Sequence, residues 1–365
     1  MCRRRRCHRK QTKDFFVSGP SITTSGSRPA AGKMLRVLAV QLSPLLALLV
    51  VIVFFAVADA RMNEEYASFL SVDTARMVAV NTIIVGTAAL GMLMIIVSGG
   101  IDLSAGTALA FSATVLAFCL KQDSGVVVAL FAAVGTGCLT GLLNGALISL
   151  LRVVPFIITL GTMSVYLGFA KLIADETTIR PNLASIPDWL KTLVTSPPDQ
   201  EWLAYPLLPN FAPGVWLFLA LAGALAFVLR STVFGRYIFA VGSNEQTARL
   251  CGINVTAMKI AVYTLAGLFV GIAGILQFAR LSNGNPTSGR GLELSIIAAV
   301  VVGGASLSGG RGSVLGTMAG ALLMVVINVG CTALGLRSAW QDVTLGTIIF
   351  VAAAFDQLRQ RRLSG

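Results

Sequence analysis

Residues 77–106 read MVAVNTIIVGTAALGMLMIIVSGGIDLSAG, an apolar run that stops at a glycine pair, an aspartate and two serines. The apolar part alone is long enough to cross a bilayer as a helix. Similar runs recur along the whole chain, and they are continuous rather than alternating in hydropathy. Continuous runs are typical of membrane helices, whereas the strands of a membrane β-barrel alternate. The sequence therefore predicts an all-α, polytopic transmembrane bundle.

The composition supports the same class of protein. Of the 365 residues, 55% are hydrophobic and 12% are charged, and the mean hydropathy is +0.81. A soluble globular protein carries about 25% charged residues. Hydropathy divides the chain into about ten predicted spans, over residues 35–58, 76–98, 105–120, 126–149, 153–174, 213–230, 256–279, 292–304, 313–332 and 339–355.

The distribution of charge predicts the orientation of these spans. Residues 1–33 hold nine basic residues and one acidic residue, so +8 of the formal net charge of +12 lies in this tail. The positive-inside rule places the tail in the cytoplasm, and ten crossings bring the basic C-terminus, residues 359–365, back to the same side. The transmembrane domain is then expected over residues 34–358, with an external loop at 175–212 and a cytoplasmic segment at 236–259.

The basic tail has a simpler explanation than nucleic-acid binding. Its Lys and Arg side chains are clustered ahead of the first span, and they are expected to form a disordered cytoplasmic arm close to anionic lipid. An alternative is that translation starts at Met34, which begins an ordinary first span. No small-residue cleavage site follows a short apolar core, so a secretory signal is not predicted.

The sequence excludes several kinds of catalytic site. His8 is the only histidine, which excludes a histidine metal cage and a Ser-His-Asp hydrolase. The six cysteines are scattered, and Cys2 and Cys7 match no zinc spacing. Residues 309–312, GGRG, lack the lysine and the spacing of a GxxxxGK[ST] phosphate loop. The chain is therefore not expected to be an enzyme or to bind a cofactor.

The broken segment at the end of the first stretch occurs twice. GGIDLSAG at 99–106 aligns with GGASLSGG at 303–310, so that five positions match 204 residues apart. Transporters commonly contain structural repeats whose interrupted helices border the substrate path. The alternative is that glycine-rich membrane turns converge in sequence. If the repeat is real, the helix-break and pathway residues are Gly99, Gly100, Asp102, Ser104, Gly303, Gly304 and Ser308.

Asp102 is expected to have a structural role at this break. A helix break frees backbone N–H groups, which Asp and Ser side chains can cap. Asp102 or Ser104 is therefore predicted to be the N-cap of the third span, near the cytoplasmic boundary, where the helix dipole stabilises a carboxylate. An intramembrane acid is also a candidate for carrying protons, but we favour the capping role.

Small residues on one face of a membrane helix let two backbones approach closely. Glycines recur every four residues in three of the predicted spans. We expect them to mark tightly packed helix pairs rather than the solute path, and they are Gly137, Gly141, Gly145, Gly267, Gly271, Gly316 and Gly320.

The predicted cytoplasmic segment contains GSNEQTARLCGINVTAMKI at residues 242–260. Ser243 and Gln246 fit a capping box, which predicts a short helix over about 244–251. Gly252 is placed to stop this helix, and Asn254 or Thr256 is placed to cap the next span. The segment is either an ordinary interfacial turn or a docking element for a cytoplasmic partner.

Three stretches together resemble a known family. They are residues 98–104 (SGGIDLS), residues 242–260, and GLELSIIAAVVVGGASLSGGRGSVLGT at 291–317. They are similar to the permease subunits of bacterial ABC sugar importers, the ribose/xylose/galactose class, which are related to branched-chain amino-acid permeases. The resemblance covers about residues 35–355. It implies a multi-pass protein of the bacterial inner membrane that works with a second permease copy (identical or a close paralogue), a cytoplasmic ATP-binding subunit and a periplasmic sugar-binding protein.

The resemblance also assigns roles to residues. The docking helix of the family falls on Glu245, Ala248 and Gly252, and we expect Ser243, Gln246 and Arg249 beside them to help couple the permease to the ATPase. The chain departs from the family at three positions. Leu292 stands where an aromatic residue is frequent, Ser295 where an acid is frequent, and Cys251 where serine is usual, so no substrate role is expected at the first two.

A sugar needs hydrogen-bond partners in a dry helix bundle, because an unmatched polar group costs about 1–3 kcal/mol. Each intramembrane polar residue is more often a link between helices than a sugar ligand. Arg290 and Glu293 are candidates for contact with the binding protein, although a first-turn acid also complements the helix dipole. The candidates for the substrate path are Asn81, Asn144, Thr159, Gln277 and Asn328.

The function implied by the resemblance is translocation of a monosaccharide, a ribose-like pentose or a hexose, driven by ATP. The permease sequence does not distinguish import of a sugar from import of a nucleoside, a signalling furanone or a branched-chain amino acid. An ion-coupled secondary transporter is disfavoured, because it normally needs buried acids in mid-span.

Overall fold

The computed structural model describes residues 30–62, 69–195, 212–337, 339–344, 346–351 and 354, with side chains from residue 45 onward. The chain divides into two compact units, Met1–Ala39 and Val40–Gly365. The larger unit holds all of the described elements apart from the start of the first helix. The predicted basic C-terminus and all but the last few residues of the predicted tail lie outside the described residues.

All the secondary structure that the model describes is helical, apart from one isolated bridge between Ile179 and Gly284. Seven of the described helices are long and apolar enough to cross a membrane, α1 by its part Leu45–Met62. They are α1 (Ala30–Met62), α2 (Val72–Val97), α4 (Val126–Leu151), α5 (Pro155–Ile173), α7 (Pro213–Ser231), α10 (Val255–Leu281) and α12 (Val314–Ala333). The shorter elements are α3 (Ala105–Lys121), η1 (Leu183–Ser185), α6 (Asp188–Thr192), α8 (Val233–Ser243), α9 (Glu245–Leu250) and α11 (Leu292–Val302).

The all-α prediction is confirmed, and seven of the predicted spans are present at full length. The spans predicted over 105–120 and 292–304 correspond to α3 and α11, which have 17 and 11 residues. An 11-residue helix rises only about 16 Å, roughly half the thickness of a bilayer core. The predicted tenth span corresponds to an apolar helix over residues 339–351, of which most residues are described.

Local sequence explains where several helices begin. Pro155 and Pro213 occupy the first turns of α5 and α7, where a missing N–H costs nothing. The Ser71 hydroxyl caps α2 by accepting from Thr74 N at 3.2 Å. Asn254 caps α10, as one of the two predicted candidates, by accepting from Ala257 N at 3.0 Å.

The central helix of the unit is α2, in which every residue from 82 to 97 is buried. It packs against α7, α10, α11 and α12. The helices α4, α5 and α7 instead expose large apolar side chains, such as Phe131, Phe169 and Phe227. This distribution fits a bundle whose surface faces lipid, because a soluble protein rarely exposes so much contiguous apolar area.

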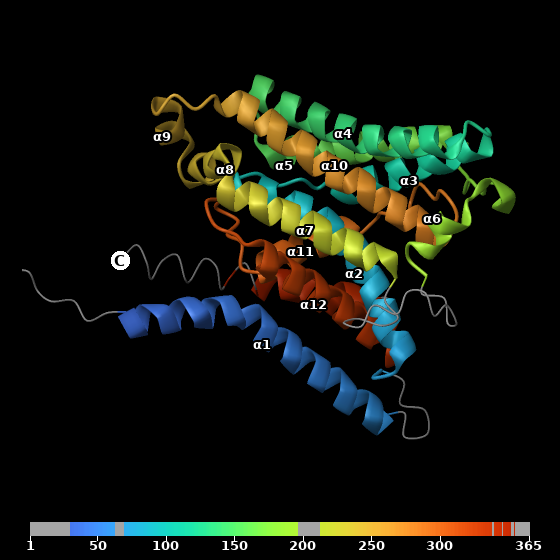
Figure 1. The fold of residues 1–365 in the computed structure, drawn as a ribbon, viewed down its shortest axis with the longest axis horizontal. Helices are drawn as coiled ribbons and strands as arrows, with labels where there is room; N and C mark the ends of the chain where they lie inside the picture. The colour runs from blue at the N-terminus through green and yellow to red at the C-terminus, as the bar shows by residue number, and fades with distance from the viewer. Residues whose placement is uncertain are drawn as a thin grey trace, which may run out of the picture. The chain divides into compact units, whose positions relative to one another are not determined.

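The glycine repeats lie where helices approach most closely, and the packing prediction is confirmed. Helices α4 and α10 run side by side (Figure 1). A Cβ added at Gly141 would lie 2.1 Å from the carbonyl oxygen of Tyr263, and one added at Gly137 would lie 2.4 Å from that of Gly267. The same holds between α11 and α12, where a Cβ at Gly320 would lie 1.9 Å from the carbonyl oxygen of Ala299.

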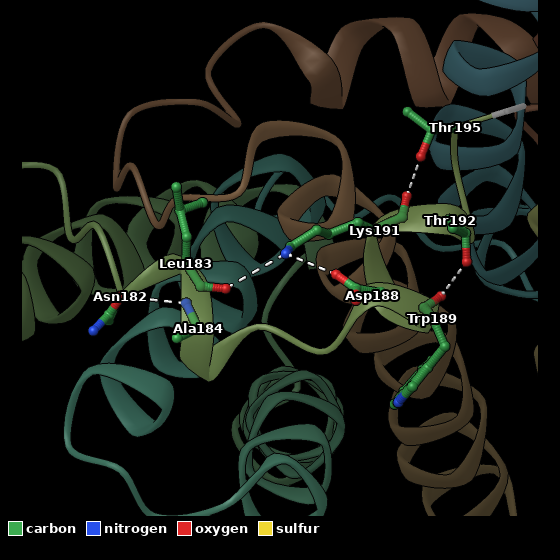
Figure 2. A network of polar contacts seen from close by, with 8 residues as sticks. All are labelled: Asn182, Leu183, Ala184, Asp188, Trp189, Lys191, Thr192 and Thr195. Carbon is green, nitrogen blue, oxygen red and sulfur yellow. Dashed lines mark hydrogen bonds and ion pairs between the residues drawn. The ribbon is translucent and has the colours of Figure 1, made fainter. Parts of the chain in front are cut away.

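The described part of the loop between α5 and α7 lies at the end of the bundle opposite α8 and α9 (Figure 1). Lys191 Nζ lies 3.1 Å from Asp188 Oδ1 and 3.4 Å from the carbonyl oxygen of Leu183, which joins α6 to η1 (Figure 2). The bridge between Ile179 and Gly284 ties the loop to the chain beyond α10. Residues 175–195 of the predicted external loop are therefore structured.

Candidate functional site

The short helix α9 is present close to its predicted position, but its cap differs from the prediction. Asn244 is the N-cap, and its Oδ1 accepts from Thr247 N at 2.9 Å. The predicted capping box of Ser243 and Gln246 is wrong, because Ser243 still belongs to α8 and donates to the Phe239 carbonyl at 2.8 Å. The backbone becomes extended only at Asn244 (φ −162°, ψ 105°), the geometry that an N-cap residue requires.

The end of α9 follows the prediction. Gly252 has φ +84°, and its N–H donates to the Arg249 carbonyl at 3.0 Å. Ile253 N then donates to the Ala248 carbonyl at 3.1 Å, which completes a Schellman turn. A left-handed residue at this position favours glycine, so Gly252 fixes the point where the chain turns toward α10.

The structure also contains a helix that the sequence-based prediction missed. Helix α8 lies directly before α9, and the Thr232 hydroxyl caps it by accepting from Gly235 N at 3.1 Å. Its buried residues, Gly235, Ile238 and Val241, are spaced by three, which is a helical signal that the prediction left unused. Val241 packs with Ala248 of α9, so α8 supports α9 from the bundle side.

Electrostatics tie α9 to the membrane helix that follows. Glu245 Oε2 lies 2.7 Å from Lys259 Nζ of α10, and Glu245 Oε1 lies 3.1 Å from Arg249 Nη2. The hydrogen bond from Lys259, helped by the charges of Lys259 and Arg249, lowers the pKa of the Glu245 carboxyl. The carboxylate is therefore ionised at neutral pH, and the pair is lost only in acid, as the pH falls through that lowered pKa. Lys259 was not among the predicted site residues.

A cavity of about 400 Å³ lies beside this ion pair. Three elements line it: the end of α4 with the turn after it, α9, and the start of α10. The charged residues in its lining are Arg152, Glu245, Arg249 and Lys259.

The two broken segments are next to each other and next to the end of α8. Gly310 N donates to the Val97 carbonyl at 2.8 Å, which links the loop after α11 to the end of α2. A Cβ added at Gly242 of α8 would lie 1.8 Å from the Val97 oxygen and 2.8 Å from Gly310 N. Gly242, Val97 and Gly310 thus form a backbone junction at which the segment before α9 touches both breaks.

The breaks share one turn geometry, but the predicted alignment is off by one residue there. Gly99 (φ +84°) and Gly304 (φ +92°) are the left-handed residues that follow α2 and α11. Their N–H groups donate to Ile96 and Val301, each three residues back, at 2.9 Å. Gly99 therefore corresponds to Gly304 rather than to Gly303, because a Schellman turn needs a positive φ at this position.

Beyond the turn, the polar residues keep the predicted register. In the first copy the Ser104 hydroxyl donates to Asp102 Oδ1 at 2.6 Å. In the second copy the hydroxyls of Ser306 and Ser308 lie 3.0 Å apart. Asp102 and Ser104 of the first copy therefore correspond to Ser306 and Ser308 of the second, although the second copy has no carboxylate.

Asp102 is buried and organises a polar network at the first break. Its side chain accepts from Ser104 N at 2.8 Å as well as from the Ser104 hydroxyl. Asn144 of α4 donates to Ser104 Oγ at 2.8 Å, and the Tyr166 hydroxyl of α5 lies 2.9 Å from Asn144 Oδ1. The network joins the break to two neighbouring helices, and the sequence alone gave no sign of it.

One expectation about this network needs correction. Ser104 is the residue before α3, but its side chain binds Asp102 and does not cap the helix. Asp102 is only 6% exposed, and its place near the cytoplasmic boundary stays a prediction. The Tyr263 hydroxyl donates to the carbonyl of the adjacent Ile101 at 3.4 Å, and Tyr263 is about 12 Å along α10 from its first residue.

The structure brings together some of the predicted path residues and separates the others. Thr159 of α5 donates to the Ile101 carbonyl at 3.4 Å, so it lies beside the network of Asp102 and Asn144. Asn81 of α2 instead accepts a hydrogen bond from Arg280. Two further candidates lie on other helices, Gln277 on α10 and Asn328 on α12.

The two candidates for contact with a binding protein differ in environment. Arg290 is exposed in the segment before α11. Glu293 lies in the first turn of α11, where its Oε1 accepts from Gly291 N at 3.1 Å. A Cβ added at Gly106 would lie 2.4 Å from Glu293 Oε2, so this carboxylate packs against the first turn of α3.

Comparison with known proteins places most of the chain in one family. Residues 74–353 match the family described as "Branched-chain amino acid transport system / permease component". The ribose import permease protein RbsC of Escherichia coli (strain K12) is 36% identical over 272 residues, which cover 74% of this chain and 82% of that protein. RbsC of Bacillus subtilis (strain 168) is 35% identical over 318 residues, 87% of this chain and 92% of that protein. The fructose import permease protein FrcC of Rhizobium meliloti is 33% identical over 290 residues, 79% of each chain. No solved structure matches the chain.

Proposed function

The chain belongs to this family of ABC-importer permeases, and we propose that it carries a monosaccharide, a ribose-like pentose or a hexose, into the cytoplasm. The observation that carries the proposal is the similarity to sugar permeases over most of both chains. The ribose permeases of two distantly related bacteria and a fructose permease all match at 33–36% identity.

Membership of the family indicates which steps of transport belong to this chain and which belong to its partner subunits. The chain is a multi-pass protein of the bacterial inner membrane. It is not an enzyme and holds no cofactor, because a separate ATPase subunit binds and hydrolyses ATP in this family. A binding protein delivers the solute. The energy of transport must therefore reach this chain through contact with the ATPase.

We propose that two copies of the chain, or this chain and a close paralogue, form the pathway, each with about ten membrane segments and both termini in the cytoplasm. The transmembrane domain then covers residues 34–358, between the basic tail and residues 359–365. Two features support this topology. The helix α9 and the loop that contains α6 lie at opposite ends of the bundle (Figure 1). Basic residues also gather around α9, at Arg236, Arg249 and Lys259.

We propose that α9 is the element that docks on the ATPase, within the cytoplasmic segment 236–259. Ala248 is buried with Val241 and Val255, so it anchors the helix to the bundle. Leu250, which the sequence-based prediction did not include, is 88% exposed. Together with the exposed residues Ser243, Gln246 and Gly252, it forms the surface proposed for docking, and Arg249 lies beside this surface at the edge of the cavity.

Two routes are proposed to carry a movement of α9 into the bundle. One is the ion pair between Glu245 and Lys259, which acts on α10. The other is the backbone junction of Gly242, Val97 and Gly310, which acts on the two breaks. Asp102, Ser104, Asn144 and Thr159 are proposed to border the solute path near the first break, because their polar atoms gather there.

Reconstitution tests the proposed solute. The permease, its ATPase and its binding protein are placed in vesicles, and uptake of radiolabelled ribose, galactose, fructose, a nucleoside and leucine is measured with and without ATP. We expect ATP-dependent uptake of one of the sugars. Uptake of leucine or of the nucleoside in place of every sugar contradicts the proposed substrate class, and uptake driven by a sodium or proton gradient without ATP contradicts the importer itself.

A further inference from the structure

The cavity beside α9 has a lining that is not explained by docking of the ATPase. It is bounded by Ser149 and Arg152 at the end of α4, by α9, and by Thr256 and Lys259 at the start of α10. Its volume of about 400 Å³ is in the range of small-molecule sites. It opens next to helix faces that carry exposed apolar side chains.

The charges around the cavity favour an anion. Its lining holds three cations, Arg152, Arg249 and Lys259, and one anion, Glu245. Arg249 and Lys259 both pair with Glu245. Arg152 is exposed, and it forms no ion pair among the residues that the structure describes. The net charge of the lining is therefore positive, and the unpaired guanidinium lies on the α4 side.

Arg152 is held in an unusual backbone conformation. It is the residue directly after α4 and has φ +54° and ψ 34°, a left-handed conformation that usually belongs to glycine or asparagine at a helix end. A cation at a helix C-terminus is stabilised by the helix dipole. The same position places the Arg152 guanidinium at the edge of the cavity.

Three cations around the cavity can donate hydrogen bonds to one anionic group. Arg152 lies beside Arg249 and Lys259 in the lining, and guanidinium and ammonium groups are suited to binding a phosphate. Ser149 also lines the cavity, but its Oγ is buried, so it is not assigned a contact.

The rest of the lining is apolar, and part of it is exposed on the surface of the bundle. Ile148, Leu150, Val153, Val154 and Val255 complete the lining. Leu150 is 70% exposed and Val154 is 61% exposed. A free anion gains nothing from contact with these apolar residues. A ligand with a charged head group and apolar chains can contact both the cations and the apolar residues.

We propose that this cavity binds the phosphate of an anionic phospholipid from the cytoplasmic leaflet, with Arg152 as its principal contact. The choice of the cytoplasmic leaflet rests on the topology proposed above, whereas the binding of the lipid does not depend on it. A lipid in this position touches the lining that contains Glu245 and Lys259. The content of anionic lipid then influences how firmly α9 is held against α10.

Native mass spectrometry of the purified permease tests the proposal without any transport measurement. The protein is titrated with dioleoylphosphatidylglycerol, with dioleoylphosphatidylcholine of the same chain length, and with inorganic phosphate. Arg152→Asn is the informative variant, because asparagine tolerates the left-handed conformation and the turn is kept. Arg152→Lys retains the charge, and Arg236→Gln removes an exposed cation of α8 that does not line the cavity.

We expect one phosphatidylglycerol to bind more tightly than phosphatidylcholine, and Arg152→Asn to weaken it about fivefold, the effect of one cation near a lipid surface. Arg152→Lys should restore most of this affinity, and Arg236→Gln should leave it unchanged. Equal binding of the two lipids, or an unchanged preference in Arg152→Asn, overturns the proposal. So does inorganic phosphate that displaces the lipid at equal concentration, since the ligand is then a free anion. None of these results bears on sugar uptake, so the proposed function is tested separately.

Discussion

The ammonium of Lys259 lies 2.7 Å from the carboxylate of Glu245, so an ion pair joins the short helix α9 to the beginning of α10. The two residues are 14 positions apart, and the turn at Gly252 lies between them. A rigid turn alone would position α9, but a charge-assisted hydrogen bond also makes a movement of α9 act on α10. If α9 docks on the ATPase as proposed, this link connects it mechanically to a membrane helix.

Replacing Lys259 tests this connection. Lys259→Met should lower ATP-dependent uptake several-fold, because α9 loses its tie to α10. The thermal stability of the permease should change little, since a partly exposed ion pair contributes about 0–1 kcal/mol. Lys259→Arg serves as the control and should retain uptake. Normal uptake in Lys259→Met, at equal protein in the membrane, would show that the pair transmits nothing.

The close contact of α4 and α10 can be tested with two glycines of the same helix. Gly141→Ala should reduce the free energy of unfolding by about 1–3 kcal/mol, because the added methyl overlaps the Tyr263 carbonyl. Gly135→Ala is the matched control: a Cβ there meets nothing within 4 Å, and alanine favours the helix. Thermal unfolding in detergent measures both. Equal stability of the two variants would mean that the helices are not packed at this distance.

The polar network at the first break predicts a graded effect at Asp102. Asp102→Ala leaves the donors of Ser104 without their acceptor and should cost about 1–3 kcal/mol of stability. Asp102→Asn keeps one acceptor oxygen and should cost less. Thermal unfolding gives the stability, and uptake shows whether solute movement also changes. A variant Asp102→Ala as stable as the wild type would argue against the network.

The native Cys251 offers a test of topology. It is the last residue of the α9 turn and is exposed, whereas Cys119 and Cys138 are partly buried and Cys331 is buried. A membrane-impermeant maleimide should label it in inside-out vesicles and not in intact spheroplasts. Cys2 and Cys7 of the predicted cytoplasmic tail are first replaced by serine, and Cys251→Ser in that background removes the signal and identifies the site. Labelling of Cys251 from the outer side would reverse the proposed orientation.

The sequence was sufficient to predict the parts of the fold that depend on local pattern. The long apolar runs predicted the long helices, Gly252 predicted the end of α9, and the spaced glycines predicted tight helix packing, although not which helices pair. These features depend on residues within one or two turns of each other, so a single sequence contains the required information.

The features that the prediction missed depend on residues far apart in the sequence. Asn144 is 40 residues from Ser104, and no local sequence pattern predicts the hydrogen bond between them. The register of the second break was wrong by one residue, because either of two adjacent glycines can supply a positive φ. Ser243 was predicted to be the N-cap of α9 because it fits the capping pattern. Helix α8 extends through Ser243, so Asn244 is the N-cap instead.

The proposed coupling depends on α9 being the point where ATP-driven movement enters this chain. The most direct measurement is sugar uptake by the reconstituted importer carrying Gly252→Trp or Gly252→Asn. A Cβ at Gly252 meets nothing within 4 Å, so a bulky side chain there projects into the space proposed for the ATPase, while asparagine is small and tolerates φ +84°. We expect that tryptophan abolishes ATP-dependent uptake and that asparagine preserves it. Full uptake with tryptophan, or uptake by the permease without ATP and the ATPase subunit, would contradict the proposed coupling.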